Sequence, residues 1–175
     1  LKSHLVLAQI SMEKSDKLRK VEEELLSTER TYVAHLSFVC EELVVPLRQR
    51  QLLPEEELRA IFSNIEILLN YHKELLSNLT VTDLAAQIVL MIPFFKNYIA
   101  YINNYGGSLH QLSVSCKRIT GLATFFEQSL KNPRYAPAQQ LSRCGGLSLS
   151  SLLIVPVQRL PRYELLMKEL LHYAP

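Results

Sequence analysis

The chain has 175 residues, which is enough for one domain with a buried core. Hydrophobic residues make up 48% of it and charged residues 21%, which excludes intrinsic disorder, and the presence of only 5 glycines argues against a many-stranded β-sandwich or barrel. The net charge of +2 argues against a nucleic-acid-binding protein, which usually carries a stronger basic excess.

The cysteines and the apolar runs indicate where in the cell the protein acts and whether it spans a membrane. Cys40, Cys116 and Cys144 lie far apart and form no zinc-binding motif, so we expect reduced thiols in an intracellular protein. The sequence shows no signal peptide, and its apolar runs fall well short of the ~20 residues that span a bilayer. We therefore expect a cytoplasmic protein with no transmembrane segment.

Apolar residues recur every three or four positions along the chain, which predicts helices. We expect helices over about residues 16–46, 54–79, 80–105 and 108–131, and a last helix from Tyr163 that ends before Pro175. Pro93 should kink the third helix and Gly106-Gly107 should close it. Residues 132–146 should be irregular, and residues 147–157 fit either a strand or a helix. The predicted fold is an elongated, all-α helical bundle.

Sequence motifs for catalysis and for cofactor binding are missing. The five histidines form no HExxH motif, no serine lies in GxSxG, and the glycine pairs belong to no phosphate-binding loop. We therefore expect no metal, no cofactor and no covalent active site. The acidic clusters at residues 22–24 and 55–57 are most simply solvated faces and partners of helix dipoles.

Glu29 breaks the local pattern, because its neighbours one turn away on either side are apolar or aromatic. One interpretation is an exposed rim position beside Arg30. The other is the polar centre of an apolar docking patch. A buried carboxylate needs hydrogen-bond donors, which this chain or another protein must supply.

The segment PVQRLPRY, residues 156–163, also departs from an ordinary helix. Its two prolines cost helix hydrogen bonds, and three polar side chains, Gln158, Arg159 and Arg162, lie close together. It is either a kinked core helix with a solvated basic edge or a surface shaped to present guanidinium groups.

Three segments together resemble the Dbl-homology (DH) domain of Rho-family guanine-nucleotide exchange factors. The first block is ELLSTERTYVAHL at 24–36, the second is PFFKNYIAYINNY at 93–105, and the third is 149–171 around PVQRLPRYELLMKELL. The blocks occur in the family's order and cover about residues 17–175, so the resemblance is specific.

The resemblance implies an exchange factor that grips the two switch regions of a Rho-, Rac- or Cdc42-like GTPase, with no covalent chemistry of its own. It implies that Glu29 contacts switch 1, that Arg162 contacts switch 2 and that Ile154 contributes to the choice of GTPase. Gln158, Arg159 and Tyr32 are expected to support the interface or the third-block helix. Val155 stands where many members carry a lysine.

The resemblance also implies an arrangement of domains. Residues 1–16 would be an extension or linker, and residues 17–175 a DH domain that stops one helix short of the family's usual end. Membrane contact would come from a neighbouring PH domain, and recruitment to the membrane or cytoskeleton would follow. Two alternatives remain open: a degenerate DH module that binds a GTPase or scaffold without exchange, and a helical adaptor of membranes or cytoskeleton, which the lack of a basic amphipathic face disfavours.

Overall fold

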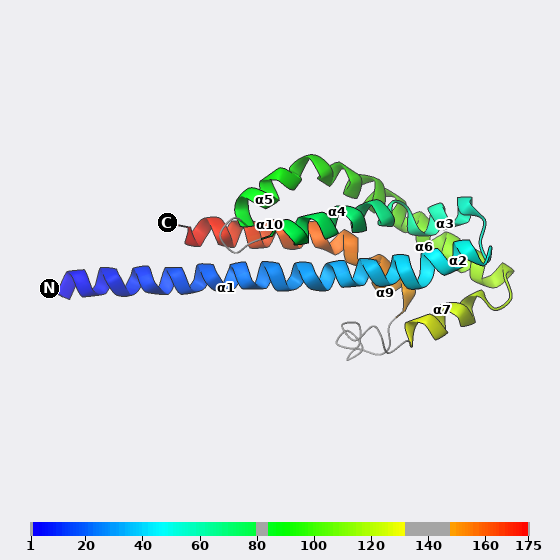
Figure 1. Cartoon of the computed structure of the whole chain (residues 1–175), viewed down its shortest axis with the longest axis horizontal. Helices are drawn as coiled ribbons and strands as arrows, with labels where there is room; N and C mark the ends of the chain where they lie inside the picture. Colours follow the sequence, from blue (N-terminus) through cyan, green and yellow to red (C-terminus); the bar gives the residue numbers. More distant parts are fainter. Residues whose placement is uncertain (1, 80–83, 132–147, 175) are drawn as a thin grey trace.

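Every regular element in the described part of the chain is a helix, and the helices form an elongated bundle (Figure 1). The computed structural model describes residues 2–79, 84–131 and 148–174, and side chains from residue 12 onward within these ranges except that of Ala85. The all-α fold predicted from the sequence is therefore confirmed. The irregular segment predicted at 132–146 and the predicted start of the third helix, at about residue 80, lie outside the described residues.

The first helix, α1 (Lys2–Phe38), lies along α10, and its N-terminal part extends past the end of α10 (Figure 1). It continues through a π-helical turn, η1 (Val39–Val44), into the short α2 (Val45–Gln49). The predicted start near residue 16 is wrong, because the backbone is already helical from Lys2 and residues 2–16 belong to the same helix. Pro46 lies near the start of α2, but the helix runs on without a break from η1, so the missing N–H of Pro46 removes one backbone hydrogen bond just after the π-helical turn.

The second predicted helix is in fact two, α3 (Glu55–Phe62) and α4 (Ile65–Asn78). Between them Ser63 takes a positive φ of 52°, which ends α3, and Asn64 precedes the first turn of α4. The acidic first turn of α3 meets the positive end of its helix dipole, as the sequence indicates.

The middle of the chain forms α5 (Leu84–Met91), the 3₁₀ turn η2 (Ile92–Phe95) and α6 (Lys96–Arg118). Pro93 lies in η2, so the predicted interruption is confirmed. Gly106 and Gly107 do not close α6, which passes through both of them. The chain turns instead at Gly121, whose φ of 85° suits a residue without a side chain, and α7 (Leu122–Leu130) follows.

The third block forms two further helices, α9 (Leu149–Leu153) and α10 (Val155–Tyr173), so residues 149–157 are helical and not a strand. The Ser148 hydroxyl caps α9 by accepting a hydrogen bond from the backbone N–H of Ser151. Pro156 occupies the first turn of α10, whereas Pro161 lies inside that helix. Pro161 cannot donate a hydrogen bond to the carbonyl of Val157, which is the cost anticipated from the sequence.

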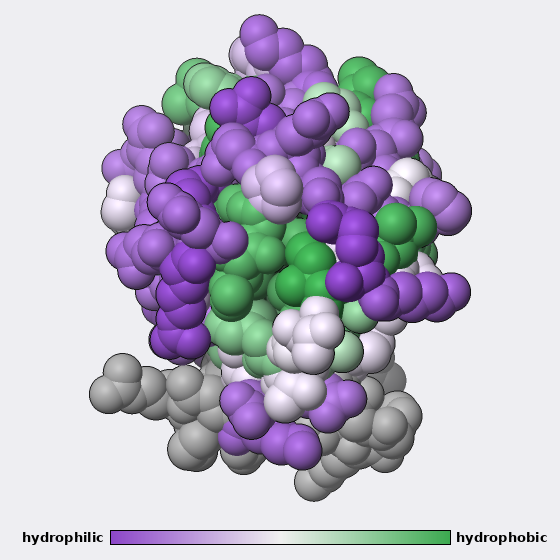
Figure 2. All heavy atoms as spheres, turned by 90° about the vertical axis from the view of Figure 1, so that its right-hand side faces the viewer, coloured by the Kyte–Doolittle hydropathy of each residue, from purple (hydrophilic) through white to green (hydrophobic). Residues whose placement is uncertain are grey.

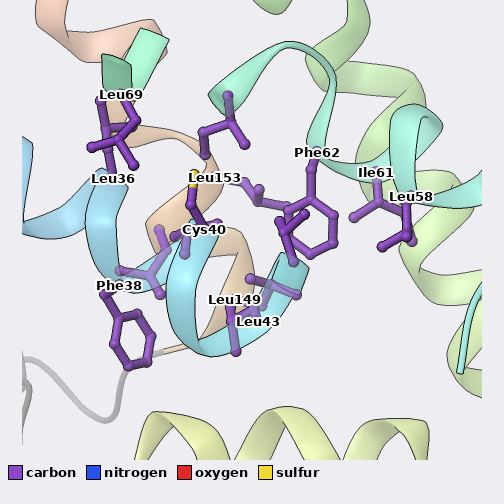
Figure 3. Close-up of a cluster of buried hydrophobic side chains, with 14 of the residues drawn as sticks. Leu36, Phe38, Cys40, Leu43, Leu58, Ile61, Phe62, Leu69, Leu149 and Leu153 are labelled. Atoms are coloured by element: carbon purple, nitrogen blue, oxygen red, sulfur yellow. The ribbon is translucent and has the colours of Figure 1, made fainter. Parts of the chain in front are cut away.

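Buried apolar side chains hold these helices together in one large cluster. Figure 3 shows Leu36 of α1, Phe62 of α3 and Leu153 of α9 as members of it. Cys40 of η1 also lies within this cluster, and burial raises the pKa of its thiol to about 12, so it stays protonated. The contacts fix the first and third blocks relative to one another although they are more than 110 residues apart in sequence.

A second cluster, which includes Leu25, Ile88 and Leu166, joins α1, α5 and α10. At the end of the bundle formed by α2 and α3, hydrophobic surface is surrounded by hydrophilic residues (Figure 2). None of the described helices combines the length and the apolar character that crossing a bilayer requires.

Candidate functional site

The first and third blocks meet where α1 packs against α10. Glu24 of α1 and Arg162 of α10 form an ion pair across this junction, with 3.0 Å between Arg162 Nη2 and Glu24 Oε1. Both side chains are 50% exposed. The first and third blocks thus share one accessible edge of the bundle.

Beside this ion pair lies an open groove of about 360 Å³, which we call the α1–α10 groove. Thr31, Gln158 and Arg162 form its exposed rim, and the buried Tyr32 and Arg159 lie at its base. The groove offers hydroxyl, amide and guanidinium donors to a neighbouring molecule. It has the chemistry of a surface that binds carbonyl and carboxylate groups.

Glu29 lies beneath the groove and has no exposed surface. Its Oε1 is 2.6 Å from Nδ1 of His72, and its Oε2 is 2.5 Å from Nη2 of Arg159 and accepts a short hydrogen bond from the hydroxyl of Tyr163. His72 Nε2 in turn is 2.6 Å from the hydroxyl of Tyr98. We call these five residues from α1, α4, α6 and α10 the buried polar network.

Glu29 has no exposed surface, so it is neither an exposed rim residue nor the polar centre of a docking surface, and both of these interpretations are wrong. The donors that it needs come from this chain, which is one of the two sources that the sequence left open. The physical reason is that a carboxylate enclosed by apolar helix faces must be neutralised and hydrogen-bonded where it lies. Arg159 and His72 meet that requirement from positions 130 and 43 residues away in sequence.

Arg159 is held from several directions. Its guanidinium Cζ lies 4.2 Å from the ring centre of Tyr163 and 5.2 Å from that of Tyr32, and its Nη1 donates to the hydroxyl of Thr28 at 3.2 Å. Cation–π contacts of this kind strengthen when the cation is desolvated, and Arg159 is only 4% exposed. Arg159 therefore fastens α10 to α1 and is not free to reach a partner.

The electrostatics of the buried polar network favour the ionised carboxylate. Burial raises the pKa of Glu29, but the hydrogen bond and coulombic attraction of His72, together with the charge of Arg159, outweigh it and hold the pKa below the ordinary value of 4.5. Burial also raises the pKa of Tyr98 and of Tyr163, so both phenols keep their protons. Each can then donate its hydroxyl proton to a neighbour.

Ile154, the predicted selectivity residue, lies at the junction between α9 and α10 and is half-buried. The residue before it is fixed in place, because the hydroxyl of Tyr101 donates to the carbonyl of Leu153 at 2.9 Å. Gln158 is one turn further along and exposed. Ile154, Gln158 and Arg162 thus follow one another at intervals of four residues along the edge of α10.

Sequence reasoning missed four residues of this region: Glu24, His72, Tyr98 and Tyr163. Glu24 opens the first block but lies within the acidic run 22–24, which reads as a solvated face. His72 continues the apolar pattern of α4, and that was a signal, because a histidine on a buried face needs polar partners. Among the described residues, no group of three His, Cys, Asp or Glu side chains could hold a metal ion.

Comparison with known proteins identifies the family. The sequence model of the RhoGEF domain matches residues 21–175. The chain belongs to the RhoGEF domain family. The resemblance to DH domains drawn from the three blocks is therefore confirmed.

The chain is also similar to curated proteins, one of which carries a RhoGEF domain by name. The chain is 31% identical over 176 residues to the myosin-M heavy chain of Dictyostelium discoideum, covering 93% of this chain and 9% of that protein. It is 30% identical over 170 residues to FYVE, RhoGEF and PH domain-containing protein 2 of Homo sapiens, covering 90% of this chain and 25% of that protein. The chain spans a quarter or less of the length of these two relatives.

Solved structures confirm that the fold is that of a DH domain. The linker–DH/PH structure of p115-RhoGEF is similar with a TM-score of 0.80 at 20% identity, over 93% of this chain and 50% of that one. The DH/PH domains of PDZ-RhoGEF, solved in complex with RhoA activated by GTPγS, give a TM-score of 0.77 at 16% identity, over 93% and 46%. At these identities the likeness establishes the fold alone.

Proposed function

We propose that this RhoGEF domain is a guanine-nucleotide exchange factor for a Rho-family GTPase and that the GTPase binds along the α1–α10 groove. The observation that carries the proposal is the exposed pair of Glu24 and Arg162, which brings the first and third blocks to one accessible edge. The family match supports the activity, and the complex of PDZ-RhoGEF with RhoA supports the class of partner.

The position of each carboxylate leads us to assign the switch 1 contact to Glu24 in place of Glu29. Glu29 could reach a partner only by abandoning Arg159 as an unpaired buried charge, which costs several kcal/mol. Glu24 is half-exposed and has one exposed partner, and such pairs open at a cost of about 0–1 kcal/mol. Glu24 can therefore exchange Arg162 for a donor on the GTPase.

The same opening releases Arg162, which we assign to switch 2 as the resemblance implies. We keep Ile154 as a selectivity contact, since its half-buried side chain lies at the end of the same edge of α10. Gln158 lies between them and offers an amide to the partner's backbone. Before docking, the ion pair holds the side chains of Glu24 and Arg162 against each other beside the groove, which reduces the entropy lost on binding.

Exchange then follows from linkage. The groove binds the nucleotide-free GTPase more tightly than the nucleotide-bound form, so by the thermodynamic cycle it weakens nucleotide affinity by the same factor. Glu24 would hold switch 1 away from the nucleotide, and Arg162 would hold switch 2 where it disturbs the phosphate and Mg²⁺ sites. No bond is made or broken by the exchange factor, and GTP enters the emptied site.

The direct test is release of fluorescent GDP from a panel of Rho-, Rac- and Cdc42-like GTPases, with binding to each nucleotide-free GTPase measured in parallel. The proposal predicts accelerated release from at least one member and tight binding to the same member. Binding without acceleration would instead support the scaffolding alternative. Neither binding nor acceleration across the panel would refute both.

We further propose a cytoplasmic location with recruitment to the membrane or cytoskeleton through a neighbouring PH domain. A relative carries such a domain by name. The net charge of the sequence is only +2, which provides little overall attraction to acidic lipids. Cosedimentation with anionic vesicles should therefore detect little binding by this chain, and strong, salt-sensitive binding would contradict this.

A further inference from the structure

A line of hydrogen bonds joins three helices beneath the α1–α10 groove. It begins at Glu29 of α1, passes through both ring nitrogens of His72 of α4 and continues to the hydroxyl of Tyr98 of α6, with 2.6 Å at each of the two contacts of His72. Tyr98 then donates to the hydroxyl of Tyr32, at 3.0 Å, which returns the line to α1. Tyr32 also lies at the base of the groove.

The direction of the first hydrogen bond follows from the chemistry of its partners. An ionised carboxylate only accepts hydrogen bonds, so Nδ1 of His72 must carry a proton and donate it to Oε1 of Glu29. This contact orients the carboxylate, because Oε1 faces α4 while Oε2 faces α10. His72 itself is fully buried and has little room to move.

The other oxygen of the same carboxylate organises α10. Oε2 of Glu29 accepts from Arg159 Nη2 and from the hydroxyl of Tyr163. Arg159 lies three positions before Arg162 and Tyr163 one position after it. Their contacts with Glu29 therefore fix the rotation of α10 about its axis at Arg162, and with it the direction of the Arg162 side chain. The ring of Tyr163 is stacked at 6.3 Å from that of His72, with 9° between the planes, which adds a second contact from α4 to α10.

We infer that His72 is a positioning residue for nucleotide exchange: by donating to Glu29 beneath the α1–α10 groove, it sets the rotation of α10 that places Arg162 opposite Glu24. The inference rests on the proposed function for its activity readout. His72 touches neither Glu24 nor Arg162 and acts through Glu29, Arg159 and Tyr163. It belongs to α4, outside the three sequence blocks.

Two substitutions test the two hydrogen bonds of His72 separately, because each variant keeps one of them and loses the other. In His72→Asn the amide nitrogen takes the place of Nδ1 and keeps the donor to Glu29. In His72→Gln the longer side chain reaches the place of Nε2 and keeps a contact with Tyr98, but Oε1 of Glu29 loses its donor. Ser108→Ala is a matched control, because Ser108 is a buried polar residue of α6 whose hydroxyl donates locally to the carbonyl of Tyr105.

The readout is exchange as a function of GTPase concentration, with far-UV circular dichroism to confirm folding. We expect His72→Gln to raise the half-saturating GTPase concentration by about tenfold, since small misplacements of a docking group have effects of this size or larger, and His72→Asn by less than about threefold. Ser108→Ala should match the parent chain. Equal half-saturating concentrations in the two folded His72 variants would show that the residue merely fills space and would overturn the inference.

Hydrogen exchange of the α10 backbone amides provides a test that needs no GTPase. His72→Gln should accelerate exchange of the amides around Arg159 and Tyr163 by about tenfold relative to His72→Asn, because α10 loses its anchor. Equal protection of α10 in the two variants would overturn the inference even if the parent chain proved inactive. Inactivity of the parent chain on every GTPase, with α10 loosened only in His72→Gln, would refute the proposed function alone.

Discussion

Replacement of Glu29 by alanine should lower the free energy of unfolding of the chain, because Glu29 lies in the buried polar network beneath the groove. The substitution removes a carboxylate with no exposed surface and leaves the guanidinium of Arg159, itself 4% exposed, without its counter-ion. It also removes the acceptor for His72 Nδ1 and for the hydroxyl of Tyr163. Each of those donors then stays buried without its partner.

The expected magnitude follows from breaking a buried ion pair by deleting one partner, which costs about 3–5 kcal/mol of the free energy of unfolding. A domain of this size has a total stability of about 5–15 kcal/mol, so the loss is a large fraction of it. At about 2–4 °C per kcal/mol for a domain of 150–250 residues, the melting temperature should fall by roughly 6–20 °C.

Thermal unfolding followed by circular dichroism measures this shift, and Glu24→Ala is the matched control. Glu24 lies on the same helix, loses the same atoms and breaks an ion pair that is half-exposed, so its variant should lose less than about 1 kcal/mol. A Glu29→Ala variant that melted within about 2 °C of the parent chain would refute the assignment of Glu29 to a buried structural pair.

Three further predictions concern stability. Folding lowers the pKa of Glu29, so its stabilising contribution is complete above the unfolded value of 4.5 and is lost as the pH falls below that value. Glu29→Gln should therefore make the free energy of unfolding, measured from urea midpoints, depend less on pH on the acid side, by up to ~1.4 kcal/mol per pH unit. An unchanged slope would contradict this. Tyr101→Phe should cost about 1–3 kcal/mol in urea unfolding, because the buried carbonyl of Leu153 loses its donor; no loss would mean that the bond is unimportant in solution. Leu153→Ala should cost about 2–5 kcal/mol, because that side chain is completely buried where α9 meets the core, and a smaller loss would show that the core collapses around it.

The fold class followed from sequence because helical periodicity is a local signal, but the ends of helices were harder to predict. Pro93 interrupted its helix as expected, since the missing N–H acts wherever proline stands. Gly106-Gly107 did not end α6, because the helix gains more from burying Tyr98 and Tyr101 on one face than two exposed glycines cost it. The helix ends instead at Arg118, and the chain then turns through Gly121, whose positive φ suits glycine, into α7.

The sequence was enough to locate the candidate site, but not to tell which of its residues are buried and which are exposed. Periodicity correctly placed Glu29 among apolar neighbours, which was itself a reason to expect burial. Its partners His72, Arg159 and Tyr163 lie 43, 130 and 134 residues away, and spacing within one helix carries no information about such pairs. Glu24 looked like one carboxylate among several until the structure placed Arg162 beside it.

The central claim is that the exposed pair on the α1–α10 edge, and not the buried carboxylate beneath it, meets the GTPase. Its most direct test is the rate of fluorescent GDP release produced by Glu24→Ala, with Glu41→Ala as control because Glu41 forms a comparably exposed ion pair with Lys73 elsewhere on the bundle. We predict that Glu24→Ala lowers the exchange rate by at least about tenfold at an unchanged melting temperature, since it removes a charge-assisted contact worth ~1.4 kcal/mol or more. Glu41→Ala should exchange like the parent chain. Full exchange by a folded Glu24→Ala variant would contradict the account.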